Sequence, residues 1–310
     1  MFLLLLAHSL SHIPHIIPKS YFSAEISGPQ WVLSAGMQIG YSSSCASFAK
    51  EASEFFSDAI YTPTGIRLSV VESTDVHLGI QITPSKDQFF RINMDPYLIE
   101  IEAANYEQLF YAFQSILQLL PPQIYSNKTV ENPPIWSAPC SLVEDRPRFQ
   151  WRGVMLDVCR HFFDVDTLKS IIDGMSHYKL NVLHLHLTED QGWRLELKNH
   201  PNLVLYGSKR DGSPKHHDAG HLDGIPYGPF YYTEEEIKDL IEYGKKRCVK
   251  IVPEIEMPGH ALSFLAGYPQ YSCTGGPFKP RCFWGVESDI ICAGNDEAIE
   301  YLEKILDDVL

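Results

Sequence analysis

Three groups of polar residues have side-chain types suited to catalysis or ligand binding, and each group directly follows a short apolar run. The first contains Arg160, whose planar guanidinium suits vicinal hydroxyls or a carboxylate. The second contains the acceptors Glu189 and Asp190 beside Trp193, and an aromatic face of this kind packs against the apolar face of a sugar ring. The third contains His260, which can titrate near neutral pH and hold a carboxyl group in position. These residue types predict a site for a ligand that carries several hydroxyl groups.

The same residues also have a purely structural interpretation. Asp157 and Arg160 could form an ion pair at the end of a strand. Glu189 could cap its loop, and Asp190 could be a solvated acid. The prediction of a site therefore depends on whether the three groups meet in space.

A metal site is the weaker interpretation. His184 and His186 alternate along one strand and point the same way, so we expect buried residues of the strand layer rather than ligands. A zinc site needs further ligands that this spacing does not supply, and the seven cysteines lack paired spacing. We therefore expect no metal and no cofactor.

The apolar runs alternate with helical patterns. Strands are expected at 153–158, 181–187 and 249–254, with helices that begin near Asp164, Thr233 and Asn295. Such alternation is typical of parallel strand–helix units with right-handed crossovers, and barrels of eight units build their sites in the loops after the strands. The predicted fold class is α/β, with residues 141–310 forming the first three units of a (β/α)₈ TIM barrel. Because three units cannot close a barrel, we expect a chain cut inside this domain.

Residues 21–140 have a different pattern of apolar residues, which predicts a small α+β domain without a catalytic role. Short strand-like runs alternate there with helical patterns, and the expected elements are strands at 66–71, 78–82 and 97–101 and helices at 46–60 and 106–120. The prolines and the charged turn within residues 133–147 are interpreted as a linker into the second half.

Composition disfavours several kinds of partner. Acidic residues exceed basic ones, 39 against 25, and the net charge of −14 disfavours nucleic acid and anionic lipid surfaces. No apolar run reaches the roughly 20 residues of a membrane span. An apolar run within residues 1–20 predicts a degenerate signal or leader, and Asn127 lies in a glycosylation sequon. Together with seven cysteines, these features favour a secreted or lysosomal/vacuolar protein.

The three groups lie in blocks that resemble glycoside hydrolase family 20, the β-N-acetylhexosaminidases. The matching blocks are residues 152–162 (RGVMLDVCRHF), 180–194 (LNVLHLHLTEDQGWR) and 252–261 (VPEIEMPGHA). The resemblance implies a retaining exo-glycosidase that removes terminal β-linked N-acetylglucosamine or N-acetylgalactosamine by substrate-assisted catalysis. Its implied substrates are N-acetylhexosamine-terminated glycans or chitooligosaccharides, and the assembly we consider for the full-length protein is a homodimer.

The resemblance also implies roles for individual residues. Arg160 matches the residue that binds the outer sugar hydroxyls, and His260 matches the histidine that supports the catalytic acid. Glu189 matches the acid after the second strand, where many relatives have Asp, so Asp190 is an alternative for this role. The family's catalytic pair is an adjacent Asp-Glu after the fourth strand. No Gly-Gly-Asp-Glu occurs in this sequence, and Asp296-Glu297 is expected to belong to the start of a helix rather than to the end of a strand. We therefore expect the chain to be inactive on its own.

Cysteines near the end of the chain also resemble this family. Cys273 and Cys292 match a loop disulfide pair, with Cys282 as a competitor for either partner. Free thiols in a long loop are the alternative.

Two other functions are compatible with the sequence. A lectin-like protein of the same fold would keep the arginine, tryptophan and histidine as a sugar-binding set without hydrolysis. A different barrel enzyme, such as a metal-assisted hydrolase, would lose its activity on chelation.

Overall fold

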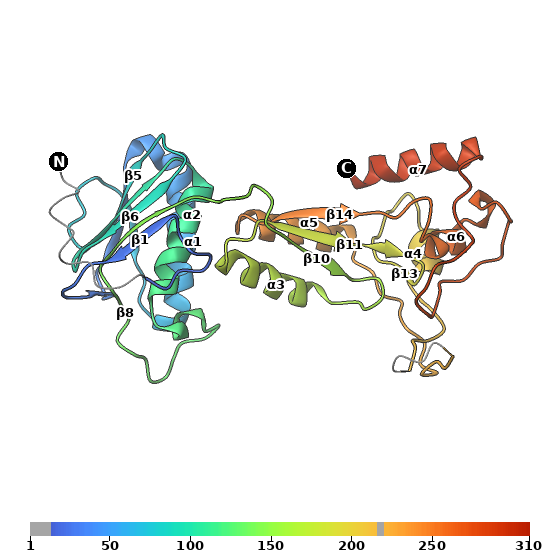
Figure 1. The fold of residues 1–310 in the computed structure, drawn as a ribbon, viewed down its shortest axis with the longest axis horizontal. Helices are drawn as coiled ribbons and strands as arrows, with labels where there is room; N and C mark the ends of the chain where they lie inside the picture. The colour runs from blue at the N-terminus through green and yellow to red at the C-terminus, as the bar shows by residue number, and fades with distance from the viewer. Residues whose placement is uncertain (1–13, 216–219) are drawn as a thin grey trace. The chain divides into compact units, whose positions relative to one another are not determined.

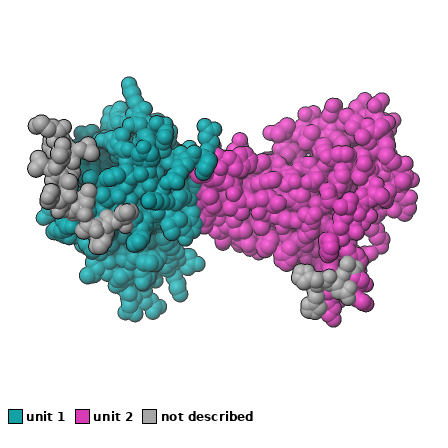
Figure 2. Space-filling model, viewed as in Figure 1, with its two compact units in different colours: residues 1–150, 177–179 teal, residues 151–176, 180–310 magenta. Residues whose placement is uncertain are grey.

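A computed structural model describes residues 14–215 and 220–310, which form two compact units (Figures 1 and 2). Unit 1 comprises residues 1–150 and 177–179, and unit 2 comprises residues 151–176 and 180–310. Most of the predicted leader, residues 1–13, lies outside the described residues. Within the described ranges, no helix has both the length and the apolar character needed to cross a lipid bilayer.

A seven-stranded mixed sheet forms the centre of unit 1, in the order β1-β9-β6-β7-β5-β3-β4. Its strands are β1 (Phe22–Glu25), β3 (Gln38–Tyr41), β4 (Ser69–Glu72), β5 (Gly79–Pro84), β6 (Phe90–Met94), β7 (Leu98–Ala103) and β9 (Ser141–Asp145). A separate antiparallel pair joins β2 (Trp31–Val32) to β8 (Ser137–Ala138). Helices α1 (Ala46–Thr64) and α2 (Tyr106–Leu119) contact each other and the sheet.

The two helices predicted in this half are confirmed. Helix α2 begins after Asn105, whose side chain accepts a hydrogen bond from the backbone of Gln108. Its apolar stripe, including Phe113 and Ile116, is buried. Helix α1 ends at Gly65, which adopts φ 72°, a left-handed conformation that glycine reaches without a steric penalty.

The interpretation of residues 133–147 as a linker needs a correction. Residues 141–145 form β9, which lies between β1 and β6 in antiparallel pairing. The side chains of Ser141, Val143 and Asp145 are buried in strict alternation. Polar residues at two of these three positions hide the alternation in the sequence. The ammonium of Lys179, 3.1 Å from Asp145, neutralises the buried carboxylate.

Unit 2 contains a three-stranded parallel sheet in the order β10-β11-β14 (Figure 1). The strands and helices of this unit are β10 (Gly153–Asp157), α3 (Val165–His177), β11 (Val182–His186), β12 (Thr188–Glu189), β13 (Gly192–Trp193), α4 (Asn202–Gly207), α5 (Glu234–Lys245), β14 (Lys250–Glu254), α6 (Leu262–Gly267) and α7 (Asp296–Val309). The alternation of strands and helices confirms an α/β fold. The helix expected near Thr233 is α5, which begins with a capping box formed by Thr233 and Glu236, and the helix expected near Asn295 is α7, which Asn295 caps.

An apolar run such as residues 153–158 is typical of a strand that is buried on both faces, but β10 is not such a strand. The side chains of β10 are exposed or half-buried, with Val154 37% and Met155 57% exposed. The core of the unit instead surrounds the central strand β11, where Leu183 and Leu185 are fully buried. An apolar run alone does not distinguish an edge strand from a central one.

Candidate active site

The carboxyl ends of the three parallel strands place Asp157, His186 and Glu254 in one row. Asp157 pairs in register with His186, and His186 pairs with Glu254. Loops that follow the carboxyl ends of parallel strands open at the same edge of the sheet, where α/β proteins bind ligands. The three polar groups singled out in the sequence all lie in these loops.

Arg160 is fixed by acidic and polar partners. Its Nη1 lies 2.7 Å from Asp157 and its Nη2 lies 2.8 Å from Glu189, while Nε donates to Oε1 of Gln191 at 3.1 Å. The side chain is nevertheless 44% exposed. The structural ion pair with Asp157 is therefore present, and it holds a guanidinium that a ligand can still reach.

Glu189 connects the arginine to the histidine. Its side chain is 2% exposed, and Oε1 lies 2.7 Å from Nδ1 of His260 while Oε2 contacts Arg160. Burial raises the pKa of Glu189, but the His186 side chain, the Asp190 backbone and Arg160 lower it overall. Glu189 is therefore a buried carboxylate that brings the guanidinium and the imidazole together.

His260 is presented by an unusual backbone. It adopts φ 48°, which non-glycine residues seldom occupy. Its side chain is 40% exposed and faces both Glu189 and Asp190, the second at 3.4 Å. The imidazole thus has one side on buried acids and another side open to solvent.

Asp190 is placed differently from its neighbour. It is fully buried, and its Oδ1 accepts a hydrogen bond from the backbone of Leu262 at 3.1 Å. Burial raises the pKa of Asp190, and no contact with Arg160 is among those of the described residues. The geometry favours Glu189 over Asp190 as the acid that links the two other groups.

The expectation that Trp193 offers a face to a sugar needs a correction. Trp193 is 1% exposed, its ring lies against Phe264, and its Nε1 donates to the backbone of Leu195 at 2.6 Å. It belongs to the core of unit 2 because β13 pairs with β12 and turns this ring inward. An aromatic residue beside acids in the sequence does not reveal which way the strand turns it.

Sequence reasoning missed the part that His186 plays at this edge. His186 is buried, with Nε2 3.0 Å from Oε2 of Glu189 and Nδ1 3.0 Å from Oε2 of Glu254. His184 reaches the same Glu254 oxygen at 2.7 Å. The register of the parallel strands is the signal that could have found this group, because it aligns the three strand-terminal residues.

Gln191 is a second residue that sequence reasoning missed. Its Oε1 accepts from Arg160, and its Nε2 donates to the backbone carbonyl of Phe283 at 2.8 Å. The backbone N–H of Arg281 donates to the backbone carbonyl of Asp190 at 2.8 Å. The segment around residues 281–283 is thereby attached to the loop that carries Glu189.

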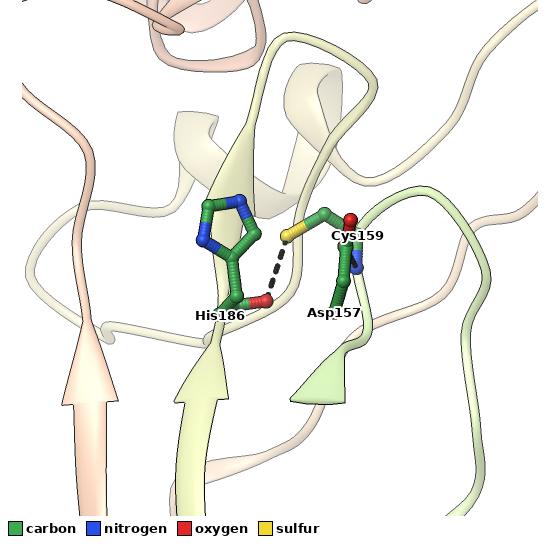
Figure 3. A group of neighbouring side chains, drawn as sticks. All are labelled: Asp157, Cys159 and His186. Carbon is green, nitrogen blue, oxygen red and sulfur yellow. Dashed lines mark hydrogen bonds between the residues drawn. The ribbon is translucent and has the colours of Figure 1, made fainter. Parts of the chain in front are cut away.

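Asp157, Cys159 and His186 lie close enough for one metal ion to touch all three (Figure 3). The thiol of Cys159, however, donates to the backbone carbonyl of His186 at 3.1 Å, as Figure 3 shows. Burial raises the pKa of the Cys159 thiol well above its usual value. A metal requires the thiolate and a free imidazole nitrogen, so this donor set does not fit a zinc ion.

Arg194 holds the loops that carry the site through buried hydrogen bonds to their backbone. It is fully buried and donates to the backbone carbonyls of Cys159, Ser208 and Phe230 at 2.7–2.9 Å. A Cβ at Gly192 would collide with its guanidinium, so a larger residue here would displace the buried arginine. The Gly192–Arg194 pair thus joins the loop after β10 to the loop after β11.

Three other predicted residues lie away from this group, of which Asn127 and Cys273 are exposed and Cys292 is half-buried. Asn127 is exposed, as a glycosylated asparagine must be. Cys273 and Cys292 are free thiols in the structure, and their side chains are hydrogen-bonded to one another.

Oxidation of the folded protein is expected to join Cys273 to Cys292 and to leave Cys282 free. The two thiols are in contact, and the neighbouring residues Ser272 and Ile291 form a backbone bridge that keeps them together. Closing a loop of this size stabilises a fold by about 3 kcal/mol. Peptide mapping after mild oxidation tests this, with Cys282→Ser as the control variant. A bond that involves Cys282, or no bond, would contradict it.

Raising the pH from about 7 to 10 is expected to lower the unfolding free energy of unit 2. Burial lowers the pKa of His186, but Glu189 and Glu254 raise it overall from 6.5 to about 9. A histidine with a raised folded pKa stabilises the fold fully below its unfolded pKa, and this contribution is lost as the pH passes the folded value. The shift corresponds to about 3 kcal/mol.

Urea unfolding at about pH 6 and pH 10 measures this effect in the wild type and in His186→Gln. The variant is expected to lose most of the difference between the two pH values. The same decrease in both proteins would show that other groups cause it.

An α/β sheet whose carboxyl edge joins an arginine, a buried carboxylate and a half-exposed histidine defines a candidate carbohydrate-binding or carbohydrate-cleaving protein. The sequence model of the glycosyl hydrolase family 20 catalytic domain matches residues 149–310. The chain belongs to this family.

Relatives support the same assignment. The chain is 40% identical to a beta-hexosaminidase of Porphyromonas gingivalis, over 76% of this chain and 29% of the relative. It is 31% identical to a beta-hexosaminidase of Vibrio furnissii, over 83% of this chain and 39% of the relative. The chain thus spans about a third of the length of these curated relatives.

Solved structures resemble the whole described chain. The GH20 beta-N-acetylhexosaminidase from Streptomyces coelicolor A3(2) matches with a TM-score of 0.82 and 29% identity, covering 97% of this chain and 58% of that one. The GH20 exo beta-N-acetylglucosaminidase from Vibrio harveyi, solved with N-acetylglucosamine, matches with a TM-score of 0.76 and 28% identity, over 97% and 45% of the two chains.

Proposed function

We propose that the protein containing these residues is a retaining exo-β-N-acetylhexosaminidase that uses the acetamide of its own substrate as the nucleophile. The observation that carries this proposal is the contact of Glu189 with both Arg160 and His260 at one sheet edge. Family 20 is a substrate-assisted exception to the two-carboxylate scheme of glycosidases. Relatives named beta-hexosaminidase and N,N'-diacetylchitobiase support a terminal N-acetylhexosamine of a glycan or chitooligosaccharide as the substrate.

Each residue of the group has a task in this proposal. Arg160 donates to the outer hydroxyls of the sugar through its exposed guanidinium edge. Glu189 keeps that guanidinium and the imidazole of His260 in place. His260 holds the general acid through its solvent-facing side, and the surrounding acids favour the positive charge that develops on the sugar ring.

The three parallel strands are, in this proposal, the first strands of a (β/α)₈ barrel. Apolar side chains left exposed on β10, such as Met155, support this because neighbouring barrel strands would cover them. The family's adjacent Asp-Glu pair does not follow any of these strands, since Asp296 and Glu297 open helix α7. We therefore propose that these 310 residues alone do not hydrolyse a glycoside.

Release of a chromogenic leaving group from a β-N-acetylglucosaminide tests the proposal. The protein in which this chain continues into a complete family 20 domain is expected to turn over, and the 310 residues alone are not. A β-glucoside with the same leaving group is the control, because it lacks the acetamide. No turnover by the complete, folded protein, or equal turnover of the glucoside, would overturn the proposal.

A lectin-like function is the second candidate. It is favoured by one observation, the partly exposed side chains of Arg160 and His260 around Glu189, which can bind a sugar without a catalytic acid. Calorimetric binding of N-acetylglucosamine by a complete, folded protein that never hydrolyses it would support this candidate instead.

A further inference from the structure

His186 is the only described side chain of the parallel sheet that touches two carboxylates through two different ring nitrogens. Nε2 lies 3.0 Å from Glu189 on one side, and Nδ1 lies 3.0 Å from Glu254 on the other. The side chain is 7% exposed, so water cannot replace either partner easily. This arrangement joins the group that contains Arg160 to the end of β14.

The charge state of the ring follows from this geometry. A neutral imidazole has one N–H donor, and its other nitrogen carries a lone pair. That lone pair would face the lone pair of a carboxylate oxygen, and the two would repel each other. With Glu189 and Glu254 both ionised, as their lowered pKa values favour, both contacts are favourable only in the imidazolium form, in which both nitrogens donate. His186 is therefore a buried cation between two anions.

Other charged groups face the ring from each neighbouring element. From the end of β10, Asp157 adds negative charge, and the Cys159 thiol is neutral. Beyond β14, Glu256 lies 3.9 Å from Nδ1 and shares a hydrogen bond with Glu254. Burial and the neighbouring Glu254 raise the pKa of Glu256. Burial also raises the pKa of Glu254, but Glu256 and His186 lower it overall, so Glu254 is the more acidic of the two.

The position of Glu189 depends on this cation. Its Oε2 is shared by the guanidinium of Arg160 and by Nε2 of His186, and its Oε1 faces His260. Arg160 is 44% exposed and is the partner that a sugar would draw toward itself. His186 is buried and fixed at its other nitrogen by Glu254, so it can hold the carboxylate while the arginine engages a ligand.

We propose that His186, as an imidazolium fixed by Glu254, is a positioning residue that holds Glu189 in the orientation shared by Arg160 and His260. This inference rests on the proposed function and extends it to a residue that does not touch the substrate. Its chemistry is a charge-assisted hydrogen bond on each side of one ring. Loss of only the His186–Glu189 hydrogen bond would release the Glu189 carboxylate. Loss of only the His186–Glu254 hydrogen bond would leave Glu189 held by His186.

Two amide variants separate the two sides of the ring. The amide nitrogen of His186→Gln occupies the place of Nε2 and still reaches Glu189, whereas that of His186→Asn occupies the place of Nδ1 and reaches only Glu254. His184→Gln is the matched control, because His184 contacts Glu254 and not Glu189. kcat and KM of the full-length protein on a β-N-acetylglucosaminide are measured from about pH 4 to 9.

We expect kcat/KM to fall about 100-fold in His186→Asn and about 10-fold in His186→Gln, because a carboxylate displaced by about 1 Å costs roughly two orders of magnitude. Both variants lose the cation beside Glu189, so the acidic limb of the pH profile should move up by about one pH unit. His184→Gln should change kcat/KM less than either. Equal losses in the two variants, a larger loss in His186→Gln, or an unmoved acidic limb would overturn the proposal.

A second measurement does not depend on catalysis or on the folding of a variant. The ¹⁵N shifts of His186 in the wild-type protein should show both ring nitrogens protonated at pH 7.5. A neutral tautomer there would overturn the positioning role even if the enzyme is active. Absent turnover together with a protonated ring would refute the proposed function and leave the imidazolium bridge standing.

Discussion

Glu189→Gln is expected to lower kcat/KM on a β-N-acetylglucosaminide by about 1000-fold. The substitution keeps the size of the side chain but removes the negative charge that Arg160, His186 and His260 share. Removing one preorganised electrostatic group from a catalytic site costs about 100- to 1000-fold in rate, and the upper value is expected here because one carboxylate orients both Arg160 and His260. The amide would also turn an N–H group toward one of these three donors.

Two control variants show whether charge and position are responsible. Glu189→Asp keeps the charge but places it one methylene farther back, a displacement of more than about 1 Å, and we expect a loss of about 100-fold. Asp190→Asn should lose less than Glu189→Gln, because burial already raises the pKa of Asp190 and it lacks a contact with Arg160 among the described residues. A greater loss in Asp190→Asn than in Glu189→Gln would reverse the assignment of the two acids.

Arg194→Met is expected to lower the unfolding free energy of unit 2 by about 4 kcal/mol or more. Methionine fills a similar volume, but it leaves the backbone carbonyls of Cys159, Ser208 and Phe230 without their buried donor. Each buried polar group left unpaired costs about 1–3 kcal/mol. Burial lowers the pKa of Arg194 to about 10, so the guanidinium is still charged at neutral pH.

Denaturant unfolding measures this loss, with Lys198→Met as the matched control. Lys198 forms ion pairs with Glu234 and Glu235 on the surface, and exposed pairs contribute at most about 1 kcal/mol. Arg194→Lys keeps the charge with fewer donors and should fall between the wild type and Arg194→Met. A loss in Arg194→Met no larger than in Lys198→Met would show that the carbonyls find other partners.

The elements of this chain were predictable where one physical signal dominates. Helices α2 and α5 have a cap residue and an apolar stripe of helical period, and both begin where those signals place them. Strand β9 was not predictable, because two of its three buried positions are polar and its partners are far away in the sequence. Burial of the aspartate at residue 145 depends on Lys179, which no local pattern reveals.

The candidate site shows the same division. The sequence identified Arg160, Glu189 and His260 because each polar residue follows an apolar strand, and the parallel sheet brings them to one edge. It misplaced Trp193, since residue type does not determine which face of a two-residue strand turns inward. The sequence did not indicate the contacts of His186 with two carboxylates, because these carboxylates come from two other strands.

We propose that Arg160, Glu189 and His260 enclose one sugar-sized site. A crystal structure of the complete protein with N-acetylglucosamine tests it most directly. The expected result is a single sugar whose outer hydroxyls accept hydrogen bonds from Arg160, with the imidazole of His260 beside the same ring. A sugar bound elsewhere, or one that leaves Arg160 and His260 without a common ligand, would contradict this proposal.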